Sequence, residues 1–329
     1  MAVDIEAVNA RVKEQSRFLD SIRAEIGRVI VGQSYLIDRL LIALLCDGHI
    51  LVEGVPGLAK TLAISTLART MGASHARVSF TPDLLPADVT GTQIYNPQVA
   101  EFTTRQGPIF VNIFLADEIN RAPAKVQSAL LEAMQERQVS IGGVTYPLPH
   151  PFMVLATQNP IESEGTYPLP EAQLDRFMLK AVVNYPNRQE ERQILERYET
   201  GHVPEVQRVV QVDDLLSART AVQEVVVNEG LRDYLVHLIL ATREPRTYRM
   251  ESLAPLIAFG ASPRATIHLA QASKAIAFLD GRGYVTPDDV KAVARDVLRH
   301  RVIITYEAEA EDLTTDEIID RVLQGVAVP

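Results

Sequence analysis

The chain has 329 residues, which is enough for about two domains. Its 32 Lys and Arg residues against 42 Asp and Glu residues give a formal net charge of -10, within an otherwise ordinary globular composition. This balance argues against a basic protein that coats nucleic acid, although a small positive groove remains compatible with it. The single cysteine, Cys46, excludes a disulfide within the chain and a cluster of thiolates, so a reducing, cytoplasmic setting fits best.

The first twenty residues mix charged and apolar side chains and do not resemble a signal peptide. The strongest apolar run covers residues 40–46, far fewer than the roughly 20 residues that a membrane helix needs. We therefore expect no membrane insertion.

Between residues 49 and 183, short apolar runs alternate with helical patterns, which is typical of βαβ units and a mainly parallel sheet. Five strands are predicted, at residues 49–53, 77–80, 110–115, 153–156 and 179–183. Two further segments interrupt the alternation and read as hairpins, one over residues 92–105 and one over residues 139–146. The first is expected to turn at Asn96-Pro97 and the second at Gly142-Gly143.

After Pro186 only helical spacing is found, so the second domain is expected to be all-helical and to start near residue 210. Ser262-Pro263 and Thr286-Pro287 each place a capping hydroxyl before a proline that suits a first helical turn. Residues 306–320 contain seven acids and no base, so the net acidity is largely local. This acidic stretch could dock a partner or could only be solvated, and solvation is the favoured interpretation.

The segment from Gly54 to Thr61 follows a strand and opens a helix predicted over residues 61–70, which is the context of a phosphate-binding loop. Backbone N–H groups of such a loop cradle a polyphosphate, while Lys60 reaches the β and γ phosphates and the Thr61 hydroxyl ligates Mg²⁺. The usual pattern has glycine before the lysine, and here Ala59 stands there; a methyl group is tolerable if the local φ is negative. A plain Gly/Pro turn would explain the glycines but not the Lys-Thr pair.

Asp117 and Glu118 form an adjacent pair of carboxylates at the end of the predicted strand 110–115. Neighbouring residues of a strand point to opposite faces, so the two can serve different tasks. Asp117 would hold the metal through water, and Glu118 would polarise the attacking water. The alternative is an acidic start of the next helix, where the helix dipole favours both charges.

Four segments together resemble the signatures of the MoxR family of AAA+ ATPases, and the likeness covers almost the whole chain. In that family, alanine is usual at the position of Ala59. The resembling segments are Gly54–Thr61, Asp117–Pro123, Ala156–Pro160 and Glu164–Phe177.

The resemblance implies an αβα P-loop NTPase core with a five-stranded parallel sheet over residues 1–209, followed by an α-helical lid over residues 210–329. The two hairpins resemble a helix-2 insert at about 90–107 and a pre-sensor-1 hairpin at about 138–147. It also implies ATP/ADP and Mg²⁺ as ligands. The residues expected to bind nucleotide are Val31, Gly32, Gly54, Val55, Pro56, Gly57, Leu58, Ala59, Lys60, Thr61, Leu62, Asp117 and Arg264, with Thr61 and Asp117 at the metal.

Three further side chains take catalytic roles beside Glu118 by the same resemblance. Asn159 matches sensor 1, which shares the hydrolytic water with Glu118, and Arg176 matches the arginine finger that acts on the neighbouring subunit's γ-phosphate. Arg264 matches sensor 2, and a cation in a first helical turn, which the dipole disfavours by about 0.3–1 kcal/mol, suits a bound phosphate. Arg121 is assigned a role in relaying the nucleotide state.

The resemblance further implies an ATP hydrolase that forms a ring, commonly a hexamer, and remodels or matures a client enzyme complex, often with a partner bearing a von Willebrand factor A domain. A nucleic-acid translocase is a first alternative, but residues 139–146 carry no base, and residues 92–105 carry only Arg105 against Glu101. A nucleotide-gated scaffold with little turnover is a second alternative, which the presence of both Glu118 and Asn159 disfavours.

Overall fold

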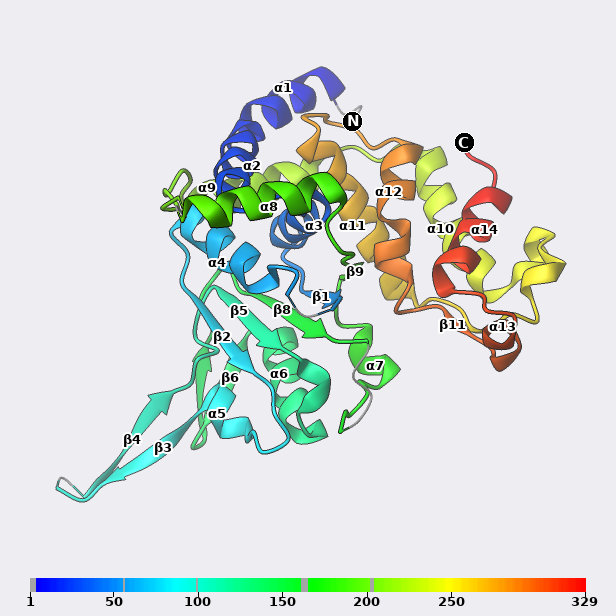
Figure 1. Ribbon diagram of the computed structural model, residues 1–329. Helices are drawn as coiled ribbons and strands as arrows, with labels where there is room; N and C mark the ends of the chain where they lie inside the picture. Colours follow the sequence, from blue (N-terminus) through cyan, green and yellow to red (C-terminus); the bar gives the residue numbers. More distant parts are fainter. Residues whose placement is uncertain (1–3, 56, 99, 161–164, 202–203) are drawn as a thin grey trace. The chain divides into compact units, whose positions relative to one another are not determined.

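The computed structural model describes residues 4–55, 57–98, 100–160, 165–201 and 204–329 (Figure 1). Two compact units are present. The core unit comprises Asp20–Arg176 and Ala181–Leu215, and the helical unit comprises the residues up to Leu19, Phe177–Lys180 and Leu216–Pro329. The boundary at residues 209 and 210 stays a prediction.

A five-stranded sheet in the order β2-β5-β8-β1-β9 forms the centre of the core unit. The pairs β2–β5, β5–β8 and β8–β1 are parallel, as the alternation of strands and helices predicts. The three middle strands are buried almost throughout because they are apolar runs covered on both faces. The α/β fold class is confirmed, with strands β1 (Ile50–Glu53), β2 (His75–Ser79), β5 (Ile113–Asp117), β8 (Met153–Gln158) and β9 (Leu179–Val182).

Helices join the strands of the core unit. Residues 40–45 of the apolar run form the buried second half of α3, and this burial explains their hydrophobicity without a membrane. Among the described residues, no helix is both long and apolar enough to span a bilayer. The helices are α2 (Arg17–Val29), α3 (Ser34–Leu45), α4 (Lys60–Met71), α5 (Pro86–Thr90), α6 (Ala124–Glu136), α7 (Glu171–Leu174) and α8 (Arg188–Thr200), with the 3₁₀ turn η1 (Ile119–Arg121) after β5.

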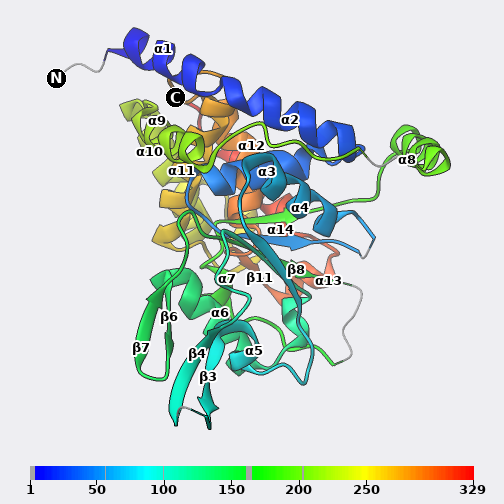
Figure 2. The same cartoon turned by 90° about the vertical axis from the view of Figure 1, so that its left-hand side faces the viewer.

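Both expected hairpins are present and extend side by side in Figure 2. One pairs β3 (Gly91–Asn96) with β4 (Glu101–Gln106), and the other pairs β6 (Gln138–Ile141) with β7 (Val144–Pro147). Gly142 and Gly143 make the second turn with φ of 59° and 84°, which glycine adopts without strain. The Tyr146 hydroxyl joins the hairpins by donating to Thr104 Oγ1 at 3.0 Å.

The helical unit has the predicted helices and adds a two-stranded antiparallel sheet that helical spacing did not predict. The helix α12 ends at Leu298, and residues 303–304 enter that sheet. The elements are α1 (Ile5–Gln15), α9 (Val212–Glu224), α10 (Glu229–Arg243), η2 (Pro245–Tyr248), η3 (Glu251–Leu253), β10 (Ile257–Phe259), α11 (Pro263–Leu279), α12 (Pro287–Leu298), β11 (Ile303–Ile304), α13 (Tyr306–Ala310) and α14 (Thr315–Gly325).

Three consecutive residues after α12 hold the short segment Phe177–Lys180 within the helical unit. Arg299 Nη1 donates to the Lys180 carbonyl at 2.9 Å, and Arg301 Nη2 donates to the Phe177 carbonyl at 2.6 Å. His300 Nε2 lies 3.0 Å from that same Phe177 oxygen. Burial, with Arg301 adding to it, holds the pKa of His300 well below its usual value, so the ring is neutral and donates this bond.

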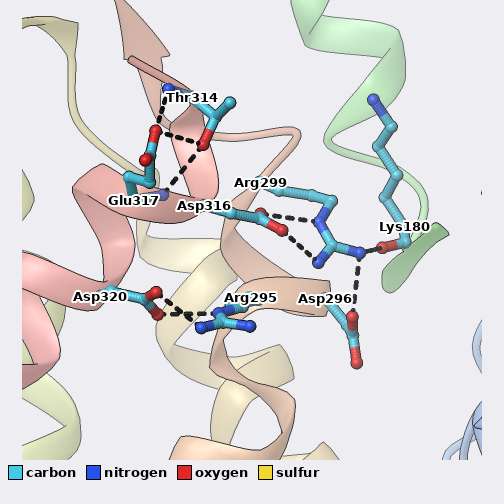
Figure 3. A network of polar contacts seen from close by, with 8 residues as sticks. All are labelled: Lys180, Arg295, Asp296, Arg299, Thr314, Asp316, Glu317 and Asp320. Carbon is cyan, nitrogen blue, oxygen red and sulfur yellow. Dashed lines mark hydrogen bonds and ion pairs between the residues drawn. The ribbon is translucent and has the colours of Figure 1, made fainter.

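Part of the acidic stretch is tied to arginines of α12 and the residue after it (Figure 3). Asp316 pairs with Arg299 at 2.8 Å, and Arg299 also contacts Asp296 at 3.0 Å. Asp320 pairs with Arg295 at 2.6 Å. The interpretation of the stretch as solvation alone is therefore wrong for Asp316 and Asp320, which attach α14 to α12.

The burial of these arginines predicts unequal effects on stability. Asp316→Asn should lower the free energy of unfolding by about 1–2 kcal/mol, because the Arg299 side chain is only 9% exposed and loses a charged partner. Asp320→Asn should cost at most about 0.5 kcal/mol, because the Arg295 side chain is 53% exposed. Chemical denaturation measures both, with Glu309→Gln on the exposed face of α13 as the control. Equal losses for Asp316→Asn and Glu309→Gln would contradict the argument.

Candidate functional site

The loop between β1 and α4 is built around Lys60, the first residue of α4. Its ammonium group turns back and donates to the Gly54 carbonyl at 2.7 Å. A side chain at Gly54 would meet the Val183 carbonyl at 2.9 Å, so the chain needs glycine there. Burial holds the pKa of Lys60 below its usual value, although the charges of Asp117 and Glu118 act in the opposite direction. The lysine is thus partly desolvated, and an anion at this place would favour its charged form.

The condition stated for Ala59, a negative φ, is not met. Ala59 has φ 55° and ψ 20°, which is the left-handed conformation. The chain must turn sharply at this residue so that α4 begins with its first N–H groups directed back toward the loop. Alanine adopts this conformation at a cost of about 1–2 kcal/mol, which glycine avoids. Pro56 of the same loop lies outside the described residues, as does Glu164 of the last family-like segment.

The register of the parallel strands brings three separate segments together. β8 lies between β1 and β5, with Glu53 opposite Gln158 and Ala116 opposite Ala156. Because the carboxyl ends of parallel strands share one edge of the sheet, the loop after β1, the acids after β5 and the residues after β8 meet there. Neighbouring strands lie roughly 5 Å apart, which is within reach of side chains.

Both oxygens of the Asp117 carboxylate are engaged. The Thr157 hydroxyl donates to Asp117 Oδ1 at 2.6 Å. Arg77, on β2, donates to Asp117 Oδ2 from Nε at 3.1 Å and from Nη2 at 2.6 Å. Sequence reasoning missed both partners; Thr157 lies within the family-like segment Ala156–Pro160, whereas Arg77 carries no motif.

Glu118 has φ 57° and ψ 50°, the second left-handed non-glycine residue of the site. Its N–H donates to Thr157 Oγ1 at 2.8 Å, and its Oε2 accepts from Arg121 Nη1 at 3.0 Å. Such backbone strain, about 1–3 kcal/mol, persists where the surroundings fix it, and it is concentrated at functional sites. The strain turns the Glu118 carboxylate away from the strand direction that Asp117 follows. The two acids are therefore separated by this turn after β5 rather than by strand alternation, and their different tasks stay a prediction.

These groups line one pocket of about 390 Å³. Most of the predicted loop, both acids and Asn159 are among its walls, together with Arg77 and Thr157. Asn159 is 7% exposed. The lining residues are Gly57, Leu58, Ala59, Lys60, Thr61, Leu62, Arg77, Asp117, Glu118, Thr157 and Asn159.

Val31 and Gly32 line a second pocket of about 320 Å³ in the same unit. Ile30 and Ile37 supply apolar wall, and α8 supplies Gln193 and Arg197. A side chain at Gly32, with φ 65°, would collide with Glu190 Oε1, so α8 approaches this turn closely. Sequence reasoning did not connect α8 with this pocket because its pattern carries no motif.

Two predicted arginines and two predicted loop residues are not among the described walls. The backbone N–H of Arg176, just after α7, donates to the Gln173 carbonyl at 3.2 Å, and Arg264 is the second residue of α11 in the helical unit. Neither these arginines nor Gly54 and Val55 line the two pockets above. Their roles at a nucleotide stay predictions.

The donor set near Lys60 fits magnesium by its chemistry. Thr61 offers a hydroxyl and Asp117 offers a carboxylate. Mg²⁺ prefers oxygen ligands and usually takes only a few of them from the protein, with water and phosphate supplying the rest. In the part of the chain that the structure describes, no group of three or more His, Cys, Asp or Glu residues could hold a metal. A metal here would therefore take most of its ligands from water or from a bound ligand.

Comparison with known proteins gives consistent matches. Residues 49–179 match the model of the ATPase family associated with various cellular activities (AAA), and residues 250–322 match the AAA lid domain. The chain is 52% identical to "Chaperone MoxR1" of Mycobacterium tuberculosis over 93% of its length and 81% of that protein. It is 35% identical to "Protein MoxR" of Paracoccus denitrificans over 95% and 97% of the two chains. The crystal structure of a candidate ATPase from Cytophaga hutchinsonii aligns over 100% of both chains, with 48% identity and a TM-score of 0.92.

The conformation of Ala59 predicts that glycine stabilises the loop. Ala59→Gly should raise the free energy of unfolding by about 0.5–1 kcal/mol, because relief of the left-handed strain exceeds the added entropy of the unfolded chain. Chemical denaturation of the nucleotide-free protein measures the change. The matched control is Ala63→Gly within α4, which should lose about 1 kcal/mol. Destabilisation by both substitutions would contradict the strain argument.

Proposed function

The chain belongs to the MoxR family of AAA+ ATPases, and on that premise we propose that it binds ATP with Mg²⁺ and hydrolyses it to remodel a client protein complex. The observation that carries the proposal is the single pocket that holds Lys60, Thr61, Asp117, Glu118 and Asn159. Three strand ends supply these groups, and together they provide a phosphate-binding cation, oxygen ligands for a metal, a base and an amide.

Phosphate binding falls to the loop and the start of α4. The N–H groups of a first helical turn are free to bind an anion, and the first residues of α4 line the pocket, where Lys60 would exchange its bond to the Gly54 carbonyl for phosphate oxygens. Thr61 and Asp117 would hold the metal, Asp117 through water. Mg²⁺, when bound, neutralises charge that develops on the phosphate oxygens. The turn at Val31 and Gly32 would receive the adenine ring against the apolar wall of the second pocket.

Hydrolysis needs a water molecule to be oriented and deprotonated. Glu118 would accept the proton of that water, and the Asn159 amide would position it from the end of β8. Arg176 of a neighbouring subunit would approach the γ-phosphate, where a permanently charged, planar guanidinium stabilises transferred charge. Arg264 would contact phosphate from the lid, and Arg121, already bonded to Glu118, would relay the nucleotide state.

We infer a ring, with six subunits as the expected number, located in the cytoplasm. The expected partner bears a von Willebrand factor A domain, and the expected client is an enzyme complex.

The hairpins support a protein client over nucleic acid, because they expose apolar side chains. Those side chains are Ile94, Tyr95, Phe102 and Val144, exposed by 42–66%. The only basic residue of the two hairpin segments is Arg105.

Two substitutions separate nucleotide binding from turnover. Lys60→Ala should weaken ATP binding by about a hundredfold or more, because the phosphates lose their charged donor. Glu118→Gln should bind ATP normally and lower steady-state turnover by about 10²–10⁴-fold, because the general base is removed. Equilibrium binding of a fluorescent ATP analogue and phosphate release measure the two effects. Arg105→Gln, exposed on β4, is the control for both.

Each outcome has a clear reading. Unchanged ATP affinity in Lys60→Ala would contradict the phosphate-loop assignment, and near-normal turnover in Glu118→Gln would exclude Glu118 as the base. Strong stimulation of hydrolysis by DNA would favour the translocase. Absence of turnover in the unsubstituted protein, with ATP bound, would favour the nucleotide-gated scaffold.

The proposed action of Arg176 across subunits predicts complementation. Arg176→Ala and Lys60→Ala should each be inactive, because one lacks the finger and the other cannot bind ATP. Mixed rings should regain part of the activity, because a Lys60→Ala subunit presents its intact Arg176 to an ATP held by an Arg176→Ala neighbour. Phosphate release from the mixture measures the gain. No gain, with mixed assembly verified by differently tagged subunits, would contradict action across subunits.

A further inference from the structure

Each of the two adjacent carboxylates of the site holds an arginine. Arg77 engages Asp117 at 2.6 Å, and Arg121 engages Glu118 at 3.0 Å. Arg121 follows Glu118 by three residues, so their contact is local. Arg77 is 40 residues from Asp117 in sequence and reaches it only because β2 lies beside β5. This second contact is therefore a feature of the folded sheet.

The sheet register aims Arg77 at this carboxylate. Ser79 lies opposite Asp117, and Arg77 lies two residues earlier on the same strand face as Ser79. The guanidinium extends along the sheet edge into the pocket that contains Lys60 and Thr61. Its side chain is 51% exposed, so solvent surrounds half of it and it has room to turn.

The contact occupies the oxygen that a metal would use. Asp117 Oδ1 is already bound by the Thr157 hydroxyl at 2.6 Å, which leaves Oδ2 for a cation or its water shell. Arg77 donates two bonds to that same Oδ2. A guanidinium and a divalent ion repel one another there, so one must leave for the other to enter.

On the basis of the proposed function, we propose that Arg77 is a positioning residue that holds Asp117 and keeps a divalent cation off it until a polyphosphate accompanies the ion. Phosphate oxygens offer Arg77 a replacement acceptor when it turns away from Asp117. The metal and the nucleotide then bind cooperatively, since each removes a cost for the other. Thr157 remains on Oδ1 throughout and keeps the carboxylate in place.

The test measures Mn²⁺, as a probe for Mg²⁺, by the loss of its free electron paramagnetic resonance signal in the absence of nucleotide. Arg77→Gln should bind Mn²⁺ about tenfold more tightly than the unsubstituted protein, because the competing charge is gone. Arg77→Lys should keep the weak binding, since it keeps the charge. Arg105→Gln, an exposed arginine on β4, should leave Mn²⁺ affinity unchanged.

Two further arms locate and quantify the effect. Adding Asp117→Asn to Arg77→Gln should return Mn²⁺ affinity to the unsubstituted value, which places the ion at Asp117. ADP should increase Mn²⁺ affinity by a smaller factor in Arg77→Gln than in the unsubstituted protein, because the competition that ADP relieves is already absent. Arg77→Met gives the same expectations should the glutamine variant fold poorly by circular dichroism.

Unchanged Mn²⁺ affinity in folded Arg77→Gln or Arg77→Met would overturn the role of Arg77, as would equal tightening in Arg105→Gln. These measurements require no hydrolysis. Failure of the unsubstituted protein to bind ATP would instead contradict the proposed function. The two failures are therefore distinguishable.

Discussion

The position of β8 between β1 and β5 is the constraint on which the site depends. Its register fixes the loop before α4, the acids after β5 and Asn159 at one edge of the sheet. Thr157, near the end of β8, links the two acidic residues, because its hydroxyl accepts a hydrogen bond from the Glu118 N–H and donates one to Asp117. A slip of one residue would turn Thr157 to the other face and leave both acids without it. The burial of β8 on both faces resists that slip.

Two strained backbone positions border the predicted nucleotide pocket. Ala59 and Glu118 adopt left-handed backbone conformations although neither is glycine, and both line the same pocket. Each cost of about 1–3 kcal/mol is offset by packing and hydrogen bonds of the sheet that the residue follows. A rigid scaffold therefore holds two unfavourable turns, one that opens α4 toward the pocket and one that separates Glu118 from Asp117.

Sequence reasoning succeeded where the signal is local. Apolar runs predicted the strands, the Gly-Gly turn predicted the second hairpin, and Lys60 with its neighbours predicted the loop. It failed where the partner is distant along the chain: Arg77 on β2 meets Asp117 only through strand pairing, and α8 approaches Gly32 only through tertiary packing. The φ of Ala59 also escaped it, because residue type alone favours the opposite sign.

The acidic side chains of both units are bound to arginines. The formal charge of -10 comes largely from residues 306–320, yet Asp316 and Asp320 of that stretch are bound to arginines of the helical unit, and Asp117 and Glu118 are bound to arginines of the core unit. The difference lies in exposure. Arg299 is 9% exposed and has no room to exchange partners, whereas Arg77 is half exposed and borders a pocket that can receive an anion. The buried ion pair of Arg299 fixes α14 to α12. The half-exposed pair of Arg77 can open when a polyvalent ligand offers better contacts.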